Sequence, residues 1–339
     1  MDWPDVFRTF AEVEIPELIE EVDLTLPAPT EGPAGQWLRP LQARVYGQPL
    51  RVTGRFQRAA RRLEVTTDNV RRLGITGLSG LVARGTPTLV LDGAEIVLPL
   101  AGAWVLVRDD AGAWALDERS AGLDAPVEKS VMAQGPFKQA FTQDFVLIYP
   151  TGGEDDAAAT SLARARHDAQ IWWYRANGCA RLVSDVDWLE HGDTWSLAGN
   201  VVLYGNADTN AAWELLIGSD GPLSVSDGEL RVGDTTFHGD DLGALFVRPR
   251  GRRHLVGAVA STGVRGDRLG DTLNLFVSGV GYPDYVAFSS RVLAEGDGGV
   301  LAAGFFDHAW ALDGHGFLAA DAPETEAASR PGRGARSRR

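Results

Sequence analysis

Sulfur and lysine are scarce in this chain of 339 residues. Cys179 is the only cysteine, so an intrachain disulfide, a cysteine-based zinc cluster and a redox pair of cysteines are all excluded. Lys129 and Lys138 are the only lysines, and arginine carries the remaining positive charge. The net charge of −14 argues against nucleic acid or an anionic membrane as the general partner.

Long apolar runs are also missing. No stretch is long enough to span a bilayer, and the acidic residues 1–24 have no apolar core of the kind found in a signal peptide. We therefore expect a cytoplasmic protein with no membrane partner, although a misassigned start would hide an export signal.

The motifs of several familiar enzymes are absent. "GLSGL" at residues 77–81 does not have the spacing of a Gly-x-Ser-x-Gly nucleophile elbow, and no P-loop, Gly-x-Gly-x-x-Gly turn or His-Glu-x-x-His helix occurs. No two histidines stand at ligand spacing, so we expect no catalytic triad, metal or cofactor; the six are His167, His191, His238, His254, His308 and His315.

Two carboxylate-containing stretches leave alternatives open. His167-Asp168 lies on a predicted helix, where a solvent-facing or capping role for His167 is favoured over catalysis. Asp240-Asp241 lies in a predicted loop. Adjacent carboxylates there are either solvated, or bind a cation, or act as acid and base.

Changes in the hydrophobic pattern divide the chain into segments. Residues 1–40 indicate short helices and a Pro/Gly-rich connector. Residues 41–120 hold short apolar or alternating runs separated by turn signals, which predict a small β-sandwich-like domain. After a linker, residues 135–312 predict an α/β domain of three layers, and the Arg-rich residues 320–339 predict a disordered tail.

The α/β prediction rests on alternating strand and helix patterns. Asp144–Pro150 is a buried strand pattern, and Asp155–Ala176 is a helical pattern that Asn177-Gly178 ends. Further strands are predicted by "ARLVSD", "GALFVRP", "HLVGAVAST" and "YPDYVAFS", and a hairpin by Asp227-Gly228. The predicted apolar stripe of the helix consists of Ala158, Leu162, Ala165, Ala169, Trp172, Trp173 and Ala176. This order favours a parallel or mostly parallel sheet.

Two glycine-containing loops follow predicted strands and are the best candidate ligand site. The loops at the carboxyl ends of neighbouring strands converge in an open α/β sheet, and glycine lets the backbone approach a ligand. The candidate residues are Thr151, Gly152, Gly153, Gly205, Asn206, Asp208 and Asn210. The alternative is that these glycines only turn the chain, while Asp208 or Thr209 caps the next helix.

Several segments resemble, in order, the region that follows the catalytic domain of large prolyl oligopeptidase-like serine peptidases. They are "LEVTTDNVRRLGI", "QGPFKQAFTQDFVLIYPTG", "NVVLYGNADTN", "VGDTTFHGDDLGALFVRPR", "GYPDYVAFS" and "AAGFFDHAW". The resemblance spans roughly residues 40–310. It implies a β module and a flavodoxin-like or Rossmann-like α/β module, without the upstream hydrolase domain or its catalytic residues. At Lys138-Gln139 the chain departs from relatives, which tend to carry acidic residues there.

Three functions follow as hypotheses. The first is a non-catalytic ancillary protein that docks on a separately encoded hydrolase or binds a small polar ligand. The second is a hydrolase or transferase that acts on a small polar substrate through Asp208, Asn210 and Asp241. The third is a scaffold whose tryptophans line a protein or carbohydrate contact, although Trp172, Trp173 and Trp213 are more simply assigned to the core.

Overall fold

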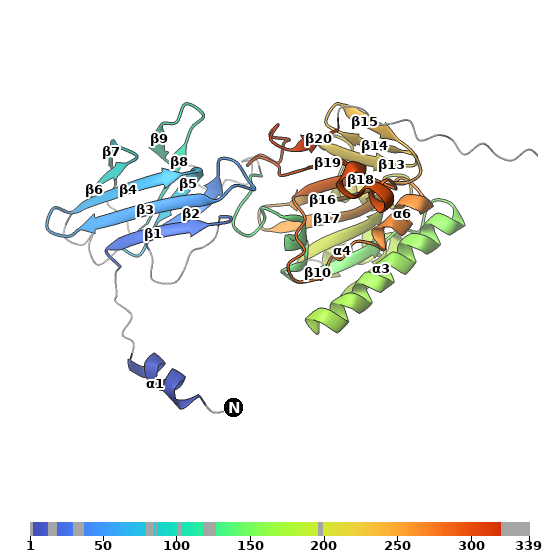
Figure 1. Ribbon diagram of the computed structural model, residues 1–339, viewed down its shortest axis with the longest axis horizontal. Helices are drawn as coiled ribbons and strands as arrows, with labels where there is room; N and C mark the ends of the chain where they lie inside the picture. The colour runs from blue at the N-terminus through green and yellow to red at the C-terminus, as the bar shows by residue number, and fades with distance from the viewer. Residues whose placement is uncertain are drawn as a thin grey trace, which may run out of the picture. The chain divides into compact units, whose positions relative to one another are not determined.

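A computed structural model describes residues 3–12, 19–29, 37–78, 85, 87–99, 103–117, 127–195 and 199–319 (Figure 1). The chain divides into two compact units, and both sheets and helices contribute to it. The first unit (the β unit) takes residues 1–135 and two later segments, Pro249–Leu255 and Phe305–His315. The second (the α/β unit) takes Pro136–Arg248, Val256–Gly304 and the residues from Gly316 onward.

The amino-terminal region contains both helix and strand. Helix α1 spans Pro4–Glu12, as predicted. The expectation of only short helices and a connector over residues 1–40 is wrong at two strands. β1, Glu21–Leu26, pairs antiparallel with β3, Leu50–Gln57, and β2, Leu38–Ala43, begins before residue 41. In β1 the side chains alternate between exposed and buried, with Val22 and Leu24 in the core, so this short strand has the period of two that a half-buried strand requires.

Two sheets of the β unit share one core. Their strand orders are β1-β3-β4-β6-β7 and β2-β5-β8-β9. The other strands are β3 Leu50–Gln57, β4 Arg62–Asp68, β5 Val70–Ile75, β6 Thr88–Leu91, β7 Ala94–Val97, β8 Trp104–Arg108 and β9 Trp114–Leu116. Leu63 and Leu89 from one sheet lie in the same buried cluster as Leu73 and Leu106 from the other. The predicted short strands are therefore present, and burial of one face of each sheet forms the core.

An eight-stranded sheet forms the centre of the α/β unit, in the order β11-β10-β12-β17-β16-β18-β19-β20. Its strands are β10 Phe145–Tyr149, β11 Arg181–Ser184, β12 Asn200–Gly205, β16 Leu242–Arg250, β17 His254–Ser261, β18 Tyr285–Ser289, β19 Val300–Gly304 and β20 Phe317–Leu318. Strands β11, β10, β12 and β17 pair in parallel, whereas β16, β18, β19 and β20 pair antiparallel. The expected parallel order thus holds for half of the sheet. Short connections such as the one between β18 and β19 do not permit parallel pairing.

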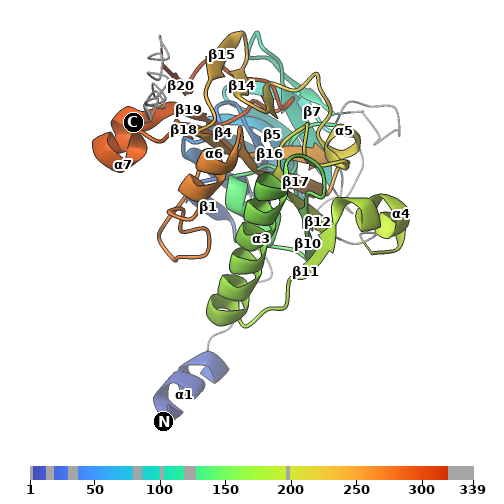
Figure 2. The same cartoon turned by 90° about the vertical axis from the view of Figure 1, so that its right-hand side faces the viewer.

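Helices cover the parallel half of this sheet. Figure 2 shows α3, Asp155–Ala176, and α4, Asp185–Trp195, on opposite sides of β10 and β11. Between these helices β12 is buried along its whole length. The other helical segments are η1 Phe137–Phe141, α5 Trp213–Leu216, α6 Val264–Gly270, α7 Val292–Glu295 and η2 Gly296–Gly299, and a separate sheet holds β13 Leu223–Ser226, β14 Glu229–Val232 and β15 Thr235–His238.

Helix α3 has the predicted bounds, but its buried face differs from the prediction. The helix ends at Asn177, whose φ of 52° is the left-handed conformation of a carboxyl-terminal cap. Ala165 is buried as expected, whereas Trp173 is 65% exposed. The fully buried positions beside Ala165 are polar: Ser161, Arg164 and Asp168.

Two predictions concern segments that the structure describes in part or not at all. The tail of residues 320–339 lies outside the described residues, as does part of the linker, residues 118–126. Among the helices of the described chain, none has the length and apolar character needed to cross a membrane.

Candidate functional site

The two predicted glycine loops meet at the carboxyl ends of β10 and β12. The backbone N–H of Gly152 donates to the carbonyl oxygen of Thr209 at 3.0 Å. The parallel register of β10 and β12 ends both strands at the same edge, which brings the loops together. The predicted convergence of the loops is therefore observed.

Thr209 occupies the space between the loops. A Cβ atom added at Gly152 would lie 2.8 Å from the carbonyl oxygen of Thr209, and one at Gly153 would lie 2.8 Å from its Cγ2. At Gly205, where φ is +89°, an added Cβ would lie 2.5 Å from Oγ1 of Thr209. The glycines thus permit close packing of one loop on the other.

The side-chain amides of these loops bind the chain itself. Asn206 Nδ2 donates to Asp227 Oδ1 at 2.8 Å and to the carbonyl of Ser261 at 2.9 Å, while its Oδ1 accepts from the N–H of Asp208 at 2.9 Å. Asn210 Nδ2 donates to the carbonyl of Tyr204 at 2.9 Å. Both asparagines are buried, so their hydrogen bonds fix the turn rather than face solvent.

Two carboxylates, Asp185 and Asp208, also accept hydrogen bonds that hold the same loops in place. Asp185, which is fully buried, accepts from the Thr151 hydroxyl at 2.7 Å through Oδ1 and from the N–H of Ala211 at 2.7 Å through Oδ2. Asp208 Oδ2 accepts from the N–H of Asp227 at 2.8 Å. A ligand would enter only if Thr209 withdrew, so binding by the seven candidate residues stays a prediction.

The pair Asp240-Asp241 separates into two environments. Asp240 is exposed and pairs with Arg265 at 3.1 Å. Asp241 is buried and accepts from the hydroxyl and the N–H of Ser290. In the described part of the chain, no group of three or more His, Cys, Asp and Glu side chains is arranged to hold a metal ion.

A buried charged pair lies on the inner face of α3. Arg164 Nε donates to Asp168 Oδ2 at 2.9 Å, and the Tyr204 hydroxyl donates to the same oxygen at 3.0 Å. Burial raises the pKa of Asp168, and Arg164 partly opposes that shift. Burial also raises the pKa of Tyr204 well above its usual value, with the Asp168 charge adding to the effect. The phenol therefore stays protonated and donates a hydrogen bond to the carboxylate.

A second carboxylate continues this polar layer toward α6. Asp267 accepts from the hydroxyls of Ser161 and Ser261, the latter at 3.0 Å. Burial raises the pKa of Asp267, and the two serine hydrogen bonds oppose the shift. His167 lies on the exposed side of α3, as predicted, in a hollow of about 640 Å³ that Arg164 and Arg268 also line. The sequence signal for this layer is the spacing of Ser161, Arg164 and Asp168 on one helical face.

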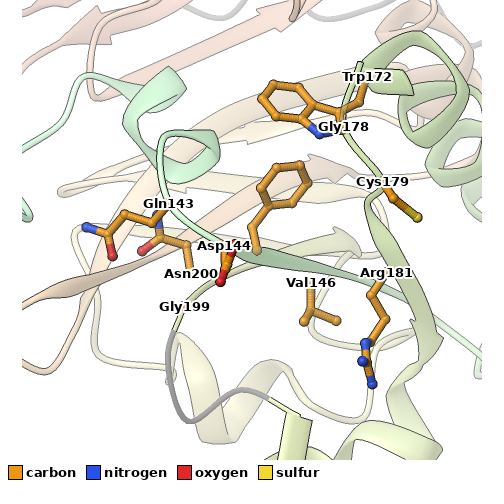
Figure 3. A pocket seen from close by; sticks show the side chains of 10 residues that line it. Gln143, Asp144, Val146, Trp172, Gly178, Cys179, Arg181, Gly199 and Asn200 are labelled. Atoms are coloured by element: carbon orange, nitrogen blue, oxygen red, sulfur yellow. The ribbon is translucent and has the colours of Figure 1, made fainter. Parts of the chain in front are cut away.

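A hollow of about 410 Å³ lies at the opposite edge of the sheet, where the parallel strands begin. Figure 3 shows Trp172 and Gly178 on one side of it and Asp144 and Asn200 together, while the Arg181 side chain extends away from Cys179. Cys179 is a free, exposed thiol. The sequence pattern indicated only the carboxyl edge of the sheet and did not predict this hollow.

A neighbouring groove of about 800 Å³ shares Trp172 with this hollow. Three aromatic rings line it edge to face: the centroid of Phe276 lies 4.9 Å from that of Phe141 and 5.2 Å from that of Trp172. Phe145, which lines the first hollow, has its ring centroid 5.0 Å from that of Trp172. Lys138 donates from its Nζ to the carbonyl of Val277 at 2.9 Å, and burial lowers its pKa. These aromatic rings form an apolar surface that stays partly open.

Comparison with known proteins gives little further constraint. No family model matches the chain. An uncharacterized secreted protein of Arthroderma benhamiae is similar to it, with 28% identity over 124 residues. That alignment covers 35% of this chain and 13% of the length of the fungal protein.

Proposed function

We propose that the chain is a non-catalytic binding module, a companion that docks on a separately encoded hydrolase. The observation that carries this proposal is the state of the two glycine loops. Their polar side chains, from Thr151 to Asn210, are bound to other parts of the same chain, and Thr209 packs between them. An enzyme of the α/β class would instead use this edge to hold its substrate.

The finer description of the fold belongs to the same proposal. We take the α/β unit as a three-layer domain of flavodoxin-like or Rossmann-like type, and the β unit as β-sandwich-like. Helices α3 and α4 beside the parallel strands support the first assignment. Two sheets with one core support the second. The motif order that resembles the region after the hydrolase domain of prolyl oligopeptidase-like peptidases supports both.

An activity screen tests the proposal that the chain is not catalytic. The purified chain is assayed with chromogenic esters, peptide amides and phosphate monoesters, beside the D208N and D241N variants. We expect no turnover above buffer. Turnover that D208N or D241N abolishes, while the circular dichroism spectrum and melting temperature stay unchanged, would establish the competing hydrolase function.

A binding experiment tests the docking part. A hydrolase from the same genome that lacks this region is mixed with the chain, and the complex is measured by calorimetry and light scattering. We expect one-to-one association and a change in the kinetics of the hydrolase. Absence of binding by every such hydrolase contradicts the docking proposal.

The proposed location is the cytoplasm. The exposed free thiol of Cys179 suits a reducing compartment, because exposed thiols in oxidising compartments form disulfides. The word "secreted" in the name of the fungal relative favours the opposite location. Cell fractionation followed by detection of the chain distinguishes the two.

A further inference from the structure

Helix α1 carries an apolar face that is exposed. Trp3, Val6, Phe7 and Phe10 recur at spacings of three and four, so they share one side of the helix. Phe7 is 69% exposed and Phe10 is 72% exposed, and no residue of α1 is buried. Large aromatic side chains arranged in this way are typical of a helix that packs in the groove of a partner.

The groove beside the aromatic rings offers a matching surface. It lies within the α/β unit, between the end of α3 and the segment that follows α6. Its lining residues are Lys138, Phe141, Thr142, Gln143, Asp144, Trp172, Arg175, Ala176, Leu275, Phe276, Val277 and Ser278. The volume of about 800 Å³ is within the range of pockets that hold ligands.

The charges of the helix and the groove are opposite. Helix α1 carries Asp5 and Glu12 against one base, Arg8, which is already paired with Asp5. The groove carries Lys138 and Arg175 against one acid, Asp144. The hydrogen bond of Lys138 goes to a carbonyl oxygen, so that bond does not neutralise its charge. The groove is therefore net positive although the chain as a whole has a net charge of −14.

We propose that helix α1 of one copy docks in this groove of a second copy, and that the exchange is reciprocal. Phe7 and Phe10 would pack on the aromatic rings, while Glu12 would face the basic rim. Two-fold symmetry repeats the contact, which doubles the buried area toward the roughly 1,600 Å² of a standard interface. Pairing of α1 with α1 is disfavoured because it brings Glu12 near the acids of its partner. This proposal does not depend on docking to a hydrolase.

The oligomeric state of the full chain is the first test. Light scattering after size-exclusion chromatography compares the wild-type chain with the F7D/F10D variant. We expect a dimer for the wild type, and at least a tenfold weaker dimer for the variant. The control L215D/L293D alters two other exposed leucines, 72% and 66% exposed, and should dimerise as the wild type does. Because no residue of α1 is buried, the melting temperature of monomeric F7D/F10D protein should not fall below that of the wild-type monomer.

A peptide titration tests whether the groove is the surface that binds helix α1. A fluorescein-labelled peptide of residues 3–12 is added to full-length F7D/F10D protein, whose grooves the proposal leaves vacant. We expect saturable binding that R175E weakens at least threefold, and no binding by the same peptide with F7D and F10D. Added salt should weaken the binding, because charged groups contribute.

Three outcomes overturn the proposal. A dimer that persists in F7D/F10D shows that another surface joins the copies. Failure of the peptide to bind shows that the groove does not accept α1. A wild-type chain that stays monomeric at every concentration, although the peptide binds F7D/F10D, assigns the groove to the helix of the same chain instead of a second copy.

Discussion

The Tyr204 hydroxyl donates to Asp168 Oδ2 across 3.0 Å, and so connects strand β12 to helix α3. Tyr204 is fully buried and Asp168 is 3% exposed. Arg164 donates to the same oxygen from the preceding turn of the helix. A buried carboxylate is stable only when such donors compensate for the loss of water.

Substitution Y204F should therefore destabilise the fold. The carboxylate of Asp168 would lose one of its two side-chain donors without regaining water, which costs about 1–3 kcal/mol. Urea unfolding measures the change. The matched control is Y174F, which removes a hydroxyl from a side chain that is 72% exposed and should change stability by less than about 0.5 kcal/mol. Equal effects of the two substitutions would show that the buried hydroxyl has no special role.

The Asp267 carboxyl should give a defined pH dependence. Burial raises its pKa above the usual 3.8, so between that value and the raised one the folded chain binds more protons than the unfolded chain. The contribution of this carboxyl to the free energy of unfolding therefore falls as the pH rises through that window. Asparagine does not ionise, so the stability of wild type minus that of D267N should fall as the pH rises above the usual carboxyl pKa of about 4.

The control for this measurement is Glu295, whose contribution to the free energy of unfolding should change with pH in the opposite direction. A hydrogen bond from Arg291 lowers the pKa of Glu295, so its contribution is present above the unfolded pKa and is lost as the pH falls through the folded pKa. The stability of wild type minus that of E295Q should rise slightly with pH, because solvent screens so exposed a pair. A rising difference for D267N would show that its folded carboxyl is not held protonated.

Alanine substitutions at Gly205 and Gly228 distinguish the cost of backbone conformation from the cost of steric packing. Both have positive φ, +89° and +73°, so an alanine at either position costs about 1 kcal/mol or more in backbone energy. Only Gly205 has close neighbours, with Thr209 Oγ1 2.5 Å and Pro150 Cγ 3.1 Å from the added Cβ. We expect G205A to lose about 1–3 kcal/mol more than G228A in urea unfolding. Equal losses would mean that Thr209 moves aside freely, as a ligand site at the loops requires.

The sequence was most informative where the local chemistry decides the structure. Asn177-Gly178 marks the end of α3 because asparagine and glycine tolerate the left-handed cap. Asp227-Gly228 forms the predicted turn between β13 and β14, with Ser226 paired to Glu229. Convergence of the loops at Gly152 and Gly205 follows from parallel pairing, which the pattern of strand and helix predicts.

The apolar pattern of the helix did not predict which charged residues are buried. Apolar spacing assigned Trp173 to the core, but Asp168 is buried instead because Tyr204, 36 residues away, supplies a donor. Helix α4 was missed because "DVDWLEHGD" has no apolar period; its first turn is held by a hydrogen bond from the N–H of Asp187 to Ser184 Oγ at 3.0 Å. Likewise, nothing in the sequence showed that Thr209 would fill the predicted ligand site.

Lys129 holds a late segment of the chain to the β unit. Its Nζ lies 3.8 Å from the centroid of the Tyr46 ring and 5.2 Å from that of Trp310, and it donates to the carbonyl of Phe306 at 2.8 Å. Its backbone N–H donates to the carbonyl of His308 at 2.8 Å. Three contacts to residues 306–310 thus come from one lysine that is 1% exposed.

Substitution K129M keeps the length of the side chain and removes the ammonium. The cation–π contact with Tyr46 and the charged hydrogen bond would both be lost, and together we expect a destabilisation of about 2 kcal/mol. Hydrogen exchange should accelerate in residues 305–315 more than in the strands of the β unit, because the contacts are local to that segment. The other lysine is the natural control: K138M removes a bond to Val277, so faster exchange should appear at residues 275–278 and not at 305–315. Unchanged exchange at residues 305–315 in K129M would show that packing of Phe306 and Trp310, rather than the ammonium, holds the segment.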